Sequence, residues 1–378
     1  MKIIFLAISS LSGIYDYRFL KKLNEKNYKV KCVIFSKEKV IIEKKYKDLT
    51  NIEYINYLPC LKIYNILGPL NLLYKIVQLR KLIKQFKPDI LHCSYVSKEG
   101  WLGALSGFHP FVLMPVGTDI LIDPFNSFKT FLKNRFSIRR ADFITCDSKY
   151  QKEFAVKVGN IIPEKVITFP WGIELEIFYP RRNNQLRDKL GWSNKTVIIR
   201  NRNLFDVYGK DLYGHKDFIE AFRIAYKKNN NLRVLLIGNG NMKNYVVEEL
   251  SKIDRECFYW FDLCNPETMA EYLNAADIYV NTSYSDGASC SMLEAMACGI
   301  PVITTDIFVN YEWIKDYING FITEKGNIGI LSEKILYLSE NKELSLKMGR
   351  NNRDLAEQKA DWNKNFQVLE EIYKKLKG

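Results

Sequence analysis

The chain has 378 residues, 47% of them hydrophobic, and a formal net charge of +13. This length suits two domains of about 150–200 residues each, and the hydrophobic content excludes a wholly disordered protein. The apolar runs are too short to span a membrane, so no transmembrane helix is expected. The apolar run at the amino terminus has the length of a strand and lacks a small-residue cleavage pattern, so we interpret it as a core strand, not a signal peptide.

The positive charge is confined to the first half of the chain. Residues 1–175 contain 28 Lys and Arg against 15 Asp and Glu, whereas the remaining residues contain 28 of each kind. Basic residues interleave with aromatic and aliphatic ones in segments 61–87 and 125–140, as in helices that lie on a lipid surface. We expect this half to meet an anionic membrane surface, with solvated helix faces as the alternative interpretation. A nucleic-acid partner is not expected, because no aromatic platform or recognised binding module accompanies the charge.

The eight cysteines show no paired C-x-x-C spacing. This pattern favours a reduced protein over a disulfide framework or a zinc site. Taken with the basic first half, it predicts a cytoplasmic protein that is peripheral at the inner face of the cell membrane.

Short apolar runs and amphipathic helical windows alternate along the chain. In the first half, the predicted strands are 2–8, 30–36, 89–95, 111–116, 142–148 and 165–172. In the second half, they are 196–202, 232–240, 257–263, 277–283, 301–306 and 319–326. The clearest helical windows are 16–29, 216–229 and 266–276. This alternation predicts parallel sheets with helices on both faces, and two such sets predict two doubly wound α/β domains.

The domain boundary is expected in segment 172–195, which is polar and irregular and precedes a fresh strand. We therefore predict a first domain of residues 1–175 and a second domain of residues 176–359. The last segment, 360–378, has an apolar stripe at helical spacing, formed by Trp362, Phe366, Leu369 and Ile372 or Tyr373.

Segment 283–306, SYSDGASCSMLEAMACGIPVITTD, places Asp286 in a loop of small residues and Glu294 in the first turns of a helix. Two interpretations of Glu294 stay open. Ser291 and Glu294 have the spacing of a capping box, which is a purely structural device. Alternatively, the free amides at the helix start receive a diphosphate, and Glu294 binds the ribose beside it. Small residues would let the backbone approach such a ligand closely, and they are Gly287, Ala288, Ser289, Cys290 and Ser291.

The stretch DGASCSMLEAMACGIPVI resembles the E-x7-E signature of the family 4 glycosyltransferases of the GT-B fold, with Asp286 in place of the first Glu. The resemblance continues in order through PDILHCSYVSKEGWLGALSGFHPFVLMPVGTDIL, ADFITCDS, VITFPWGIELEIFYP, VLLIGNG and AADIYVNTS. It implies two Rossmann-like domains that face each other across a cleft, the first for the acceptor and the second for a nucleotide-sugar donor. It also implies that a terminal helix, 360–378, returns to the first domain, so Trp362 or Phe366 should be buried against residues numbered below about 180.

The resemblance gives three residues a role at the donor. Asp286 matches the residue that faces the donor sugar, Glu294 the one that binds the ribose, and Arg202 the basic residue that neutralises the departing diphosphate. A strand-end salt bridge is the alternative for Arg202. A companion lysine is usual in the family, but an apparent insertion in FDVYGKDLYGHKDFIEAF leaves Lys210 and Lys216 as alternatives.

Three residues of the first half are further candidates. Gly13 stands where the family carries paired glycines that approach the donor. His92 comes at the end of a predicted strand, which suits either a cleft residue or a core imidazole. Asp119 follows another predicted strand and is a candidate for contact with donor or acceptor.

The expected activity is that of a retaining glycosyltransferase of the hexosyltransferase type. It would move a sugar from a nucleotide-sugar, expected to be a UDP-sugar, to a lipid-linked or saccharide acceptor in surface polysaccharide or glycolipid synthesis. No D-x-D motif occurs, so neither a metal nor another cofactor is expected, and Arg202, a lysine and helix amides would stabilise the leaving group. The alternatives are a GT-B relative such as a nucleotide-sugar epimerase and a basic nucleic-acid-binding protein. A dinucleotide oxidoreductase would need G-x-G-x-x-G after the first strand, which is absent.

Overall fold

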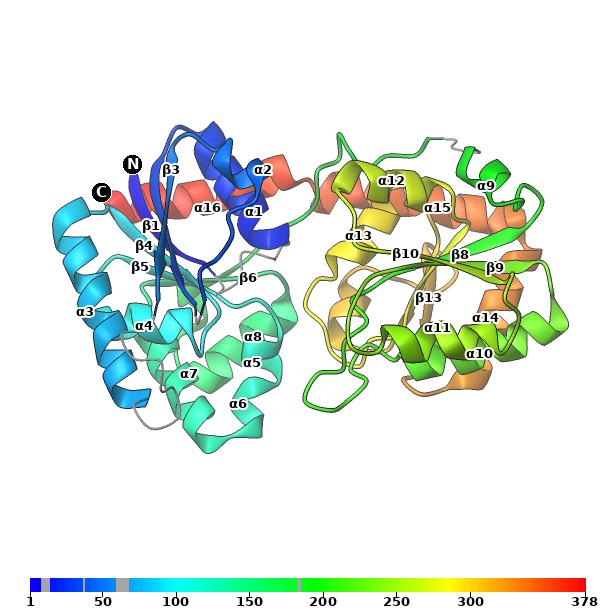
Figure 1. The fold of residues 1–378 in the computed structure, drawn as a ribbon, viewed down its shortest axis with the longest axis horizontal. Coiled ribbons are helices and arrows are strands. Elements are labelled where there is room, and N and C mark those ends of the chain that lie inside the picture. The colour runs from blue at the N-terminus through cyan, green and yellow to red at the C-terminus, as the bar shows by residue number, and fades with distance from the viewer. Residues whose placement is uncertain (8–13, 37, 59–67, 182–184) are drawn as a thin grey trace. The chain divides into compact units, whose positions relative to one another are not determined.

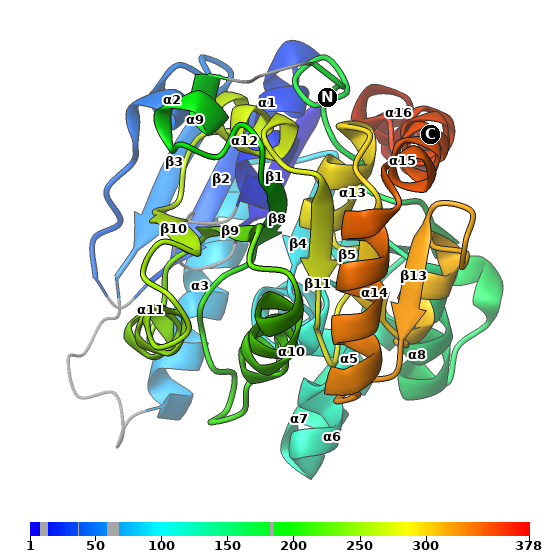
Figure 2. The ribbon, with the colours of Figure 1, turned by 90° about the vertical axis from the view of Figure 1, so that its right-hand side faces the viewer.

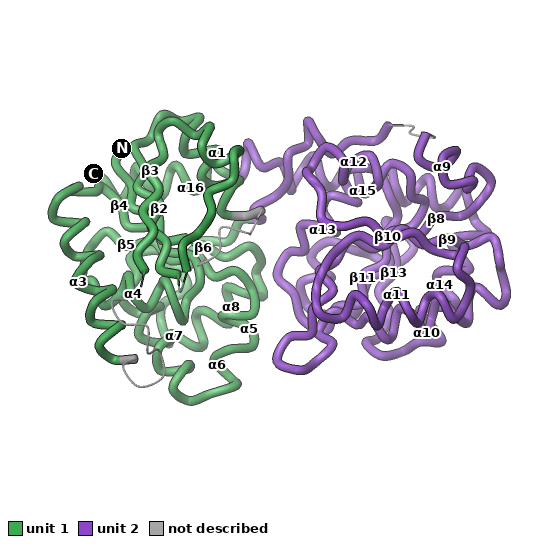
Figure 3. Tube along the Cα trace, in the orientation of Figure 1, with its two compact units in different colours: residues 1–169, 366–378 green, residues 170–365 purple. Residues whose placement is uncertain are grey.

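The computed structural model describes residues 1–7, 14–36, 38–58, 68–181 and 185–378. It divides into two compact units, residues 1–169 with 366–378 (unit 1) and residues 170–365 (unit 2), which Figure 3 distinguishes by colour. The division falls a few residues before the boundary expected at 175. Each unit contains one parallel sheet, which confirms the predicted pair of doubly wound α/β domains.

The sheet of unit 1 has the strand order β3-β2-β1-β4-β5-β6-β7, and Figure 1 labels five of these strands, β3, β1, β4, β5 and β6. Its strands are β1 (Lys2–Leu6), β2 (Lys29–Phe35), β3 (Ile52–Tyr57), β4 (Ile90–Ser94), β5 (Phe111–Met114), β6 (Phe143–Cys146) and β7 (Val166–Thr168). Strand β3 was not predicted. It is an edge strand in which Ile52 alone is buried, so its sequence lacks the continuous apolar run of a central strand.

Helices cover both faces of this sheet. They are α1 (Ile14–Glu25), α2 (Lys44–Lys47), α3 (Gly68–Phe86), α4 (Glu99–Ser106), α5 (Thr118–Leu121), α6 (Asp123–Asn126), α7 (Phe128–Arg140), α8 (Lys149–Gly159) and the short 3-10 helix η1 (Pro163–Lys165). Helix α4 contacts α3 and α7, and α7 contacts α8, so these four helices form one layer (Figure 1).

The sheet of unit 2 has the order β10-β9-β8-β11-β12-β13. Its strands are β8 (Thr196–Asn201), β9 (Leu232–Ile237), β10 (Phe258–Phe261), β11 (Ile278–Asn281), β12 (Val302–Thr305) and β13 (Gly320–Thr323). Its helices are α9 (Gln185–Lys189), α10 (His215–Lys228), α11 (Lys243–Ser251), α12 (Pro266–Asn274), α13 (Cys290–Ala297), η2 (Phe308–Glu312), α14 (Ile328–Glu340) and α15 (Lys342–Lys359), several of which are seen end-on in Figure 2.

Strand β8 shows how the unit 2 sheet is buried on both faces. Val197 and Ile199 belong to one hydrophobic core, and Ile198 between them belongs to the other. Because successive side chains of a strand point to opposite faces, an unbroken apolar run is needed where helices cover both faces. The order of strands reverses between β8 and β11, and in such sheets ligands bind outside the carboxyl ends of the strands at that point.

The last helix, α16 (Trp362–Lys377), begins in unit 2 and ends in unit 1. Phe366 is fully buried with its ring centre 6.4 Å from that of Phe19 on α1. At the start of α16, the amide of Trp362 donates to the carbonyl of Ile173 at 3.0 Å, and the Trp362 side chain is buried. These contacts confirm that Trp362 and Phe366 are buried against residues numbered below 180.

Among the helices of the described ranges, none has the length and hydropathy to cross a bilayer. The seven cysteines of those ranges are free thiols, and all but Cys264 are buried. Cys60 lies outside the described residues.

Candidate active site

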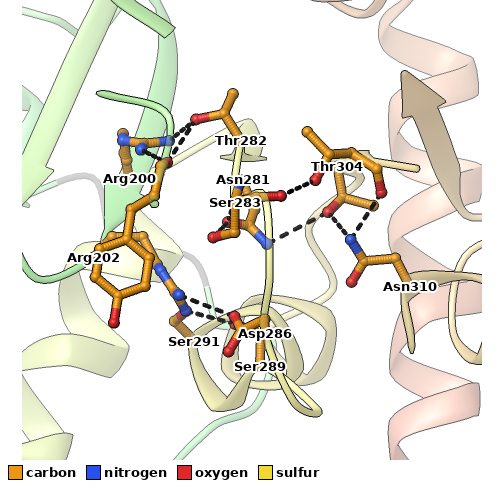
Figure 4. Close-up of polar contacts among 12 residues, drawn as sticks. Arg200, Arg202, Asn281, Thr282, Ser283, Asp286, Ser289, Ser291, Thr304 and Asn310 are labelled. Carbon is orange, nitrogen blue, oxygen red and sulfur yellow. Dashed lines mark hydrogen bonds and ion pairs between the residues drawn. The ribbon is translucent and has the colours of Figure 1, made fainter. Parts of the chain in front are cut away.

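The candidate site lies at the carboxyl ends of β8 and β11, where the strand order of unit 2 reverses. Arg202 directly follows β8, and residues 282–289 connect β11 to helix α13. Figure 4 shows the side chains of this region, with Arg202 close to Asp286, Ser289 and Ser291. The fold therefore brings the predicted basic residue to the predicted loop and helix start.

The guanidinium of Arg202 is held by groups on the loop and on α13. Its Nη2 atom lies 2.9 Å from Oδ2 of Asp286. Its Nη1 atom donates to the hydroxyl of Ser289 at 3.0 Å and to that of Ser291 at 3.4 Å. The two side chains of the ion pair are only 11% and 20% exposed, so a fixed positive charge lies at the start of α13 beside a largely buried carboxylate.

Tyr213 lies against the same arginine. The guanidinium carbon of Arg202 is 4.5 Å from the centre of the Tyr213 ring, a cation–π distance. Burial raises the pKa of Tyr213, so its hydroxyl keeps its proton and is a hydrogen-bond donor. No sequence motif pointed to Tyr213 as a residue of this site.

A glycine allows Tyr213 to reach this position. Gly214 has φ of +62°, and a Cβ atom at this position would lie 2.2 Å from the carbonyl oxygen of Thr282. Only glycine allows this approach without displacing the backbone. The Thr282 hydroxyl donates to the Gly214 carbonyl at 2.6 Å, which fixes the start of α10 against the end of β11.

Arg200, two residues before Arg202, is fully buried and supports the site from within the unit. It donates to the Thr282 hydroxyl at 2.8 Å and to the Tyr213 carbonyl at 2.6 Å. Burial, and then the nearby charge of Arg202, lowers the pKa of Arg200 to about 10. Burial, and then the nearby charges of Arg200 and Arg202, lower the pKa of His215 to about 2, so this imidazole is neutral. Arg200 therefore positions the Tyr213 backbone, and it does so away from solvent.

The capping-box interpretation of Glu294 is wrong. Helix α13 begins at Cys290 with Ser289 as the residue before it, so Ser291 is already inside the helix, and its hydroxyl contacts Arg202. Glu294 is buried, and its carboxylate accepts a hydrogen bond from Nδ2 of Asn201 at 3.3 Å. Asn201 ends β8, so Glu294 points to the same edge of the sheet as Arg202.

The loop of small residues is packed and braced. Gly287, Ala288, Ser289 and Cys290 are all buried, and Ala288 packs against the segment that follows β12.

Beneath the loop, polar side chains link the ends of β11 and β12 (Figure 4). The Ser283 hydroxyl donates to Asn281 at 2.7 Å, Asn281 donates to Thr304 at 3.4 Å, and Asn310 donates to Thr304 at 2.7 Å. This network holds the backbone that carries Asp286.

The two candidate lysines are both exposed. Lys210 is exposed in a tight hairpin, in which the amide of Val207 donates to its carbonyl at 2.8 Å and Tyr208 and Gly209 have φ of +56° and +73°. Lys216 is exposed on α10, and its Nζ atom lies 5.7 Å from the ring centre of Tyr245 on α11. Arg202 is instead in contact with Tyr213.

His92 is a core residue of unit 1, so of the two interpretations left open by the sequence the core imidazole is correct and the cleft residue is wrong. It is fully buried between the rings of Phe5 and Phe19, and its Nδ1 atom is hydrogen-bonded to the hydroxyl of Tyr373 on α16. Burial lowers its pKa to about 3, so the imidazole is neutral.

Asp119 also has a structural position. It is fully buried, and its carboxylate accepts hydrogen bonds from the amides of Val96, Val116 and Gly117 at 2.8–3.0 Å. Asp119 therefore joins the loops that follow β4 and β5, which corrects its assignment to ligand contact. Gly13 lies outside the described residues.

Comparisons with known proteins show the family to which the chain belongs. The family model described as "Glycosyl transferase 4-like" matches residues 2–148, and the model "Glycosyl transferases group 1" matches residues 191–355. An uncharacterized glycosyltransferase of Methanocaldococcus jannaschii is 28% identical over 351 residues, which cover 88% of this chain and 87% of the relative. The UDP-Gal:alpha-D-GlcNAc-diphosphoundecaprenol alpha-1,3-galactosyltransferase of Escherichia coli is 26% identical over 298 residues, covering 74% and 73%.

The fold of the chain also matches that of a solved structure. The crystal structure of Anabaena HepE in complex with UDP matches with a TM-score of 0.79 and 18% identity, covering 98% of this chain and 99% of HepE. The family models and the relatives define the class of the molecule as a glycosyltransferase, and the solved structure shows the same fold of two Rossmann-like domains. The chain belongs to the family 4 type of the GT-B glycosyltransferases, as its resemblance implied.

Proposed function

We propose that the protein is a retaining, metal-independent glycosyltransferase that uses a UDP-sugar and transfers the sugar to a lipid-linked or saccharide acceptor. The observation that carries this proposal is the placement of Arg202 at the start of α13, at the switch point of the unit 2 sheet. A cation and the free amides of a helix start form a site for a diphosphate. UDP as the nucleotide portion of the donor is supported by the E. coli relative, whose donor is UDP-Gal, and by HepE, which was crystallised with UDP.

The chemistry follows from where charge develops. As the bond between the sugar carbon and the β-phosphate oxygen breaks, negative charge grows on the phosphate, where Arg202 and the α13 amides stabilise it. The acceptor oxygen bonds to the same carbon on the same face of the sugar, and the acceptor proton passes to the departing phosphate. Asp286 contacts hydroxyls of the donor sugar, and Glu294 with Asn201 binds the ribose.

Tyr213 takes the place that a companion lysine has in the family. Its ring holds the Arg202 guanidinium in position, and its hydroxyl, near both Arg202 and Asp286, donates to the diphosphate. Among the described residues, none is hydrogen-bonded to this hydroxyl. The proposal therefore gives the role left open between Lys210 and Lys216 to a neutral donor.

A lipid-linked acceptor is supported by the E. coli relative, which acts on a sugar linked to diphosphoundecaprenol. A lipid-linked acceptor also suits the basic first half of the chain.

The test is calorimetric titration of UDP into the native protein and the Arg202→Ala variant, with Arg223→Ala as the control. Arg223 forms a surface ion pair with Glu249 on the outside of unit 2. We expect affinity to fall at least about tenfold for Arg202→Ala, the worth of a charged hydrogen bond, and to stay native for the control. Equal affinity of all three proteins would refute the site.

Product analysis then tests the reaction. With EDTA present, a panel of UDP-sugars is incubated with candidate acceptors, and the anomeric configuration of the product is read by NMR. Retention supports the proposal. Inversion contradicts the retaining mechanism, and conversion of the donor to its epimer without acceptor identifies the alternative activity.

A further inference from the structure

We propose that the outer face of helix α7, together with α6, is the surface by which the protein docks on an anionic lipid bilayer. The inference rests on the lipid-linked acceptor of the proposed function. It concerns a surface of unit 1 that is separate from the site at Arg202.

The first observation is an exposed apolar stripe. Phe128, Leu132 and Phe136 are four residues apart, so they lie on one face of α7, and they are 76%, 48% and 39% exposed. Phe125 on the preceding helix is 57% exposed. The opposite side of α7 already contributes Ile138 to the core of unit 1, so the stripe is additional to the face that folding requires. A contiguous apolar stripe of this kind marks an interaction site.

A second stripe lies on the same helical layer. Leu70, Leu73 and Val77 on α3 are 49%, 56% and 51% exposed, again at helical spacing. Helix α4 contacts both α3 and α7, so the two exposed helices flank it. The layer thus presents apolar side chains from two helices.

The charge of helices α3 and α7 indicates which kind of partner binds this surface. Helices α3 and α7 together contain nine Lys and Arg and no Asp or Glu. A second copy of the chain, placed on this surface by two-fold symmetry, would bring like charges together. An anionic bilayer supplies the opposite charge to the basic side chains and an apolar layer to the aromatic and leucine side chains.

The position of the stripe suits the reaction. In a parallel sheet, each helix that follows a strand begins at the carboxyl edge, so the first turns of α3 and α7 lie toward that edge of unit 1 (Figure 1). Ligands of doubly wound folds bind at the same edge. Docking through α7 therefore brings the lipid surface to the edge at which an acceptor head group is expected.

The experiment is sedimentation of the full chain with vesicles, without donor or acceptor. Vesicles of phosphatidylcholine alone are compared with vesicles of equal parts phosphatidylcholine and phosphatidylglycerol, at low and high salt. The test variant is Phe128→Ser/Leu132→Ser, and the control is Ile162→Ser/Leu346→Ser, which changes two residues that are 67% and 56% exposed elsewhere. Circular dichroism and thermal melting establish that all proteins are folded.

We expect binding to the anionic vesicles that weakens with salt, with partitioning reduced about tenfold in the stripe variant and unchanged in the control. Equal partitioning of native and stripe variant overturns the proposal, as does equal binding to both kinds of vesicle. Conversion of a dimer to a monomer by the stripe substitutions, measured by analytical ultracentrifugation, identifies a second copy as the occupant and also overturns it. UDP titration of the same variants separates the two proposals, because donor binding should be native in all of them.

Discussion

The guanidinium carbon of Arg202 lies 4.5 Å from the centre of the Tyr213 ring, and its Nη2 atom lies 2.9 Å from the Asp286 carboxylate. Arg202 is therefore oriented before any donor binds. A preoriented cation does not have to lose side-chain freedom when the diphosphate arrives, so more of its attraction contributes to affinity. The cost of this arrangement is that the donor must share the guanidinium with Asp286.

The first prediction separates the ring of Tyr213 from its hydroxyl. Tyr213→Phe should weaken UDP binding about tenfold through loss of one hydrogen bond to a charged group, and Tyr213→Ala should weaken it further because Arg202 also loses its packing. Isothermal titration calorimetry provides both values. Lys210→Ala and Lys216→Ala are the controls, each expected within about twofold of native at moderate salt. A large loss in either lysine variant, with Tyr213→Phe native, would return the role to that lysine.

The second prediction concerns the ribose. Glu294→Gln should weaken UDP binding by about 1–3 kcal/mol, because a carboxylate accepts stronger hydrogen bonds from hydroxyls than an amide does. Inorganic pyrophosphate has no ribose, so its affinity should be the same for both proteins. Calorimetric competition between the two ligands measures the difference. If UDP affinity is retained while the melting temperature falls, Glu294 has only a structural role through Asn201.

The third prediction is that activity survives EDTA. Arg202, Tyr213 and the amides of α13 would then neutralise the diphosphate without a divalent cation. Release of UDP is followed in a coupled assay with and without the chelator. Loss of activity with EDTA and its recovery with Mg²⁺ or Mn²⁺ would contradict this.

The fourth prediction is a pH dependence of stability in unit 1. Glu99 is buried at the start of α4, and burial raises its pKa from 4.5 to about 7. The folded state therefore holds this proton where the unfolded state has released it, so the contribution of Glu99 to the free energy of unfolding falls as pH rises from about 4.5 to 7. Glu99→Gln has no such proton. Its melting temperature should depend less steeply on pH across this window than that of the native protein, and identical slopes would show that the pKa is not raised.

The fifth prediction concerns the terminal helix. Phe366→Ala should destabilise unit 1 by about 3–5 kcal/mol, the usual cost of deleting a fully buried aromatic ring. Deletion of residues 360–378 should abolish transfer. Urea unfolding followed by fluorescence measures the first effect, and exposed Lys374→Ala is the control, expected within about 0.5 kcal/mol of native. A truncated protein with native activity would reject the structural role of α16.

Much of this fold was predictable because its central strands are buried on both faces and read as continuous apolar runs. Strand β3 was missed since an edge strand with half-exposed residues has no such run. One of the two interpretations of Glu294, the capping box, was wrong for a different reason. Ser291 and Glu294 have the spacing of a capping box, but Ser289 precedes the helix and Ser291 contacts Arg202, a residue distant in sequence.

Tyr213 illustrates a second limit. The insertion before α10 contains two Tyr-Gly pairs, and only the structure shows that Tyr208 and Gly209 form the turn of a hairpin whereas Gly214 packs against Thr282. The useful signal was present in the sequence as a glycine directly before an amphipathic helix. His92 lies in the middle of β4 and Asp119 lies within α5, not at strand ends, and their burial depends on α16 and on loop amides that pattern alone does not locate.

The path of α16 has a consequence for synthesis of the chain. Residues 170–365 form unit 2 as one stretch of the chain, whereas unit 1 needs residues 366–378, which leave the ribosome only after all of unit 2. Until then the core of unit 1 around His92 of β4 and Phe19 of α1 lacks its Phe366 and Tyr373 partners. The unit whose synthesis begins first is therefore completed only after the other unit has been made. A stop codon just before residue 366 would remove part of unit 1 while leaving residues 170–365 of unit 2 whole.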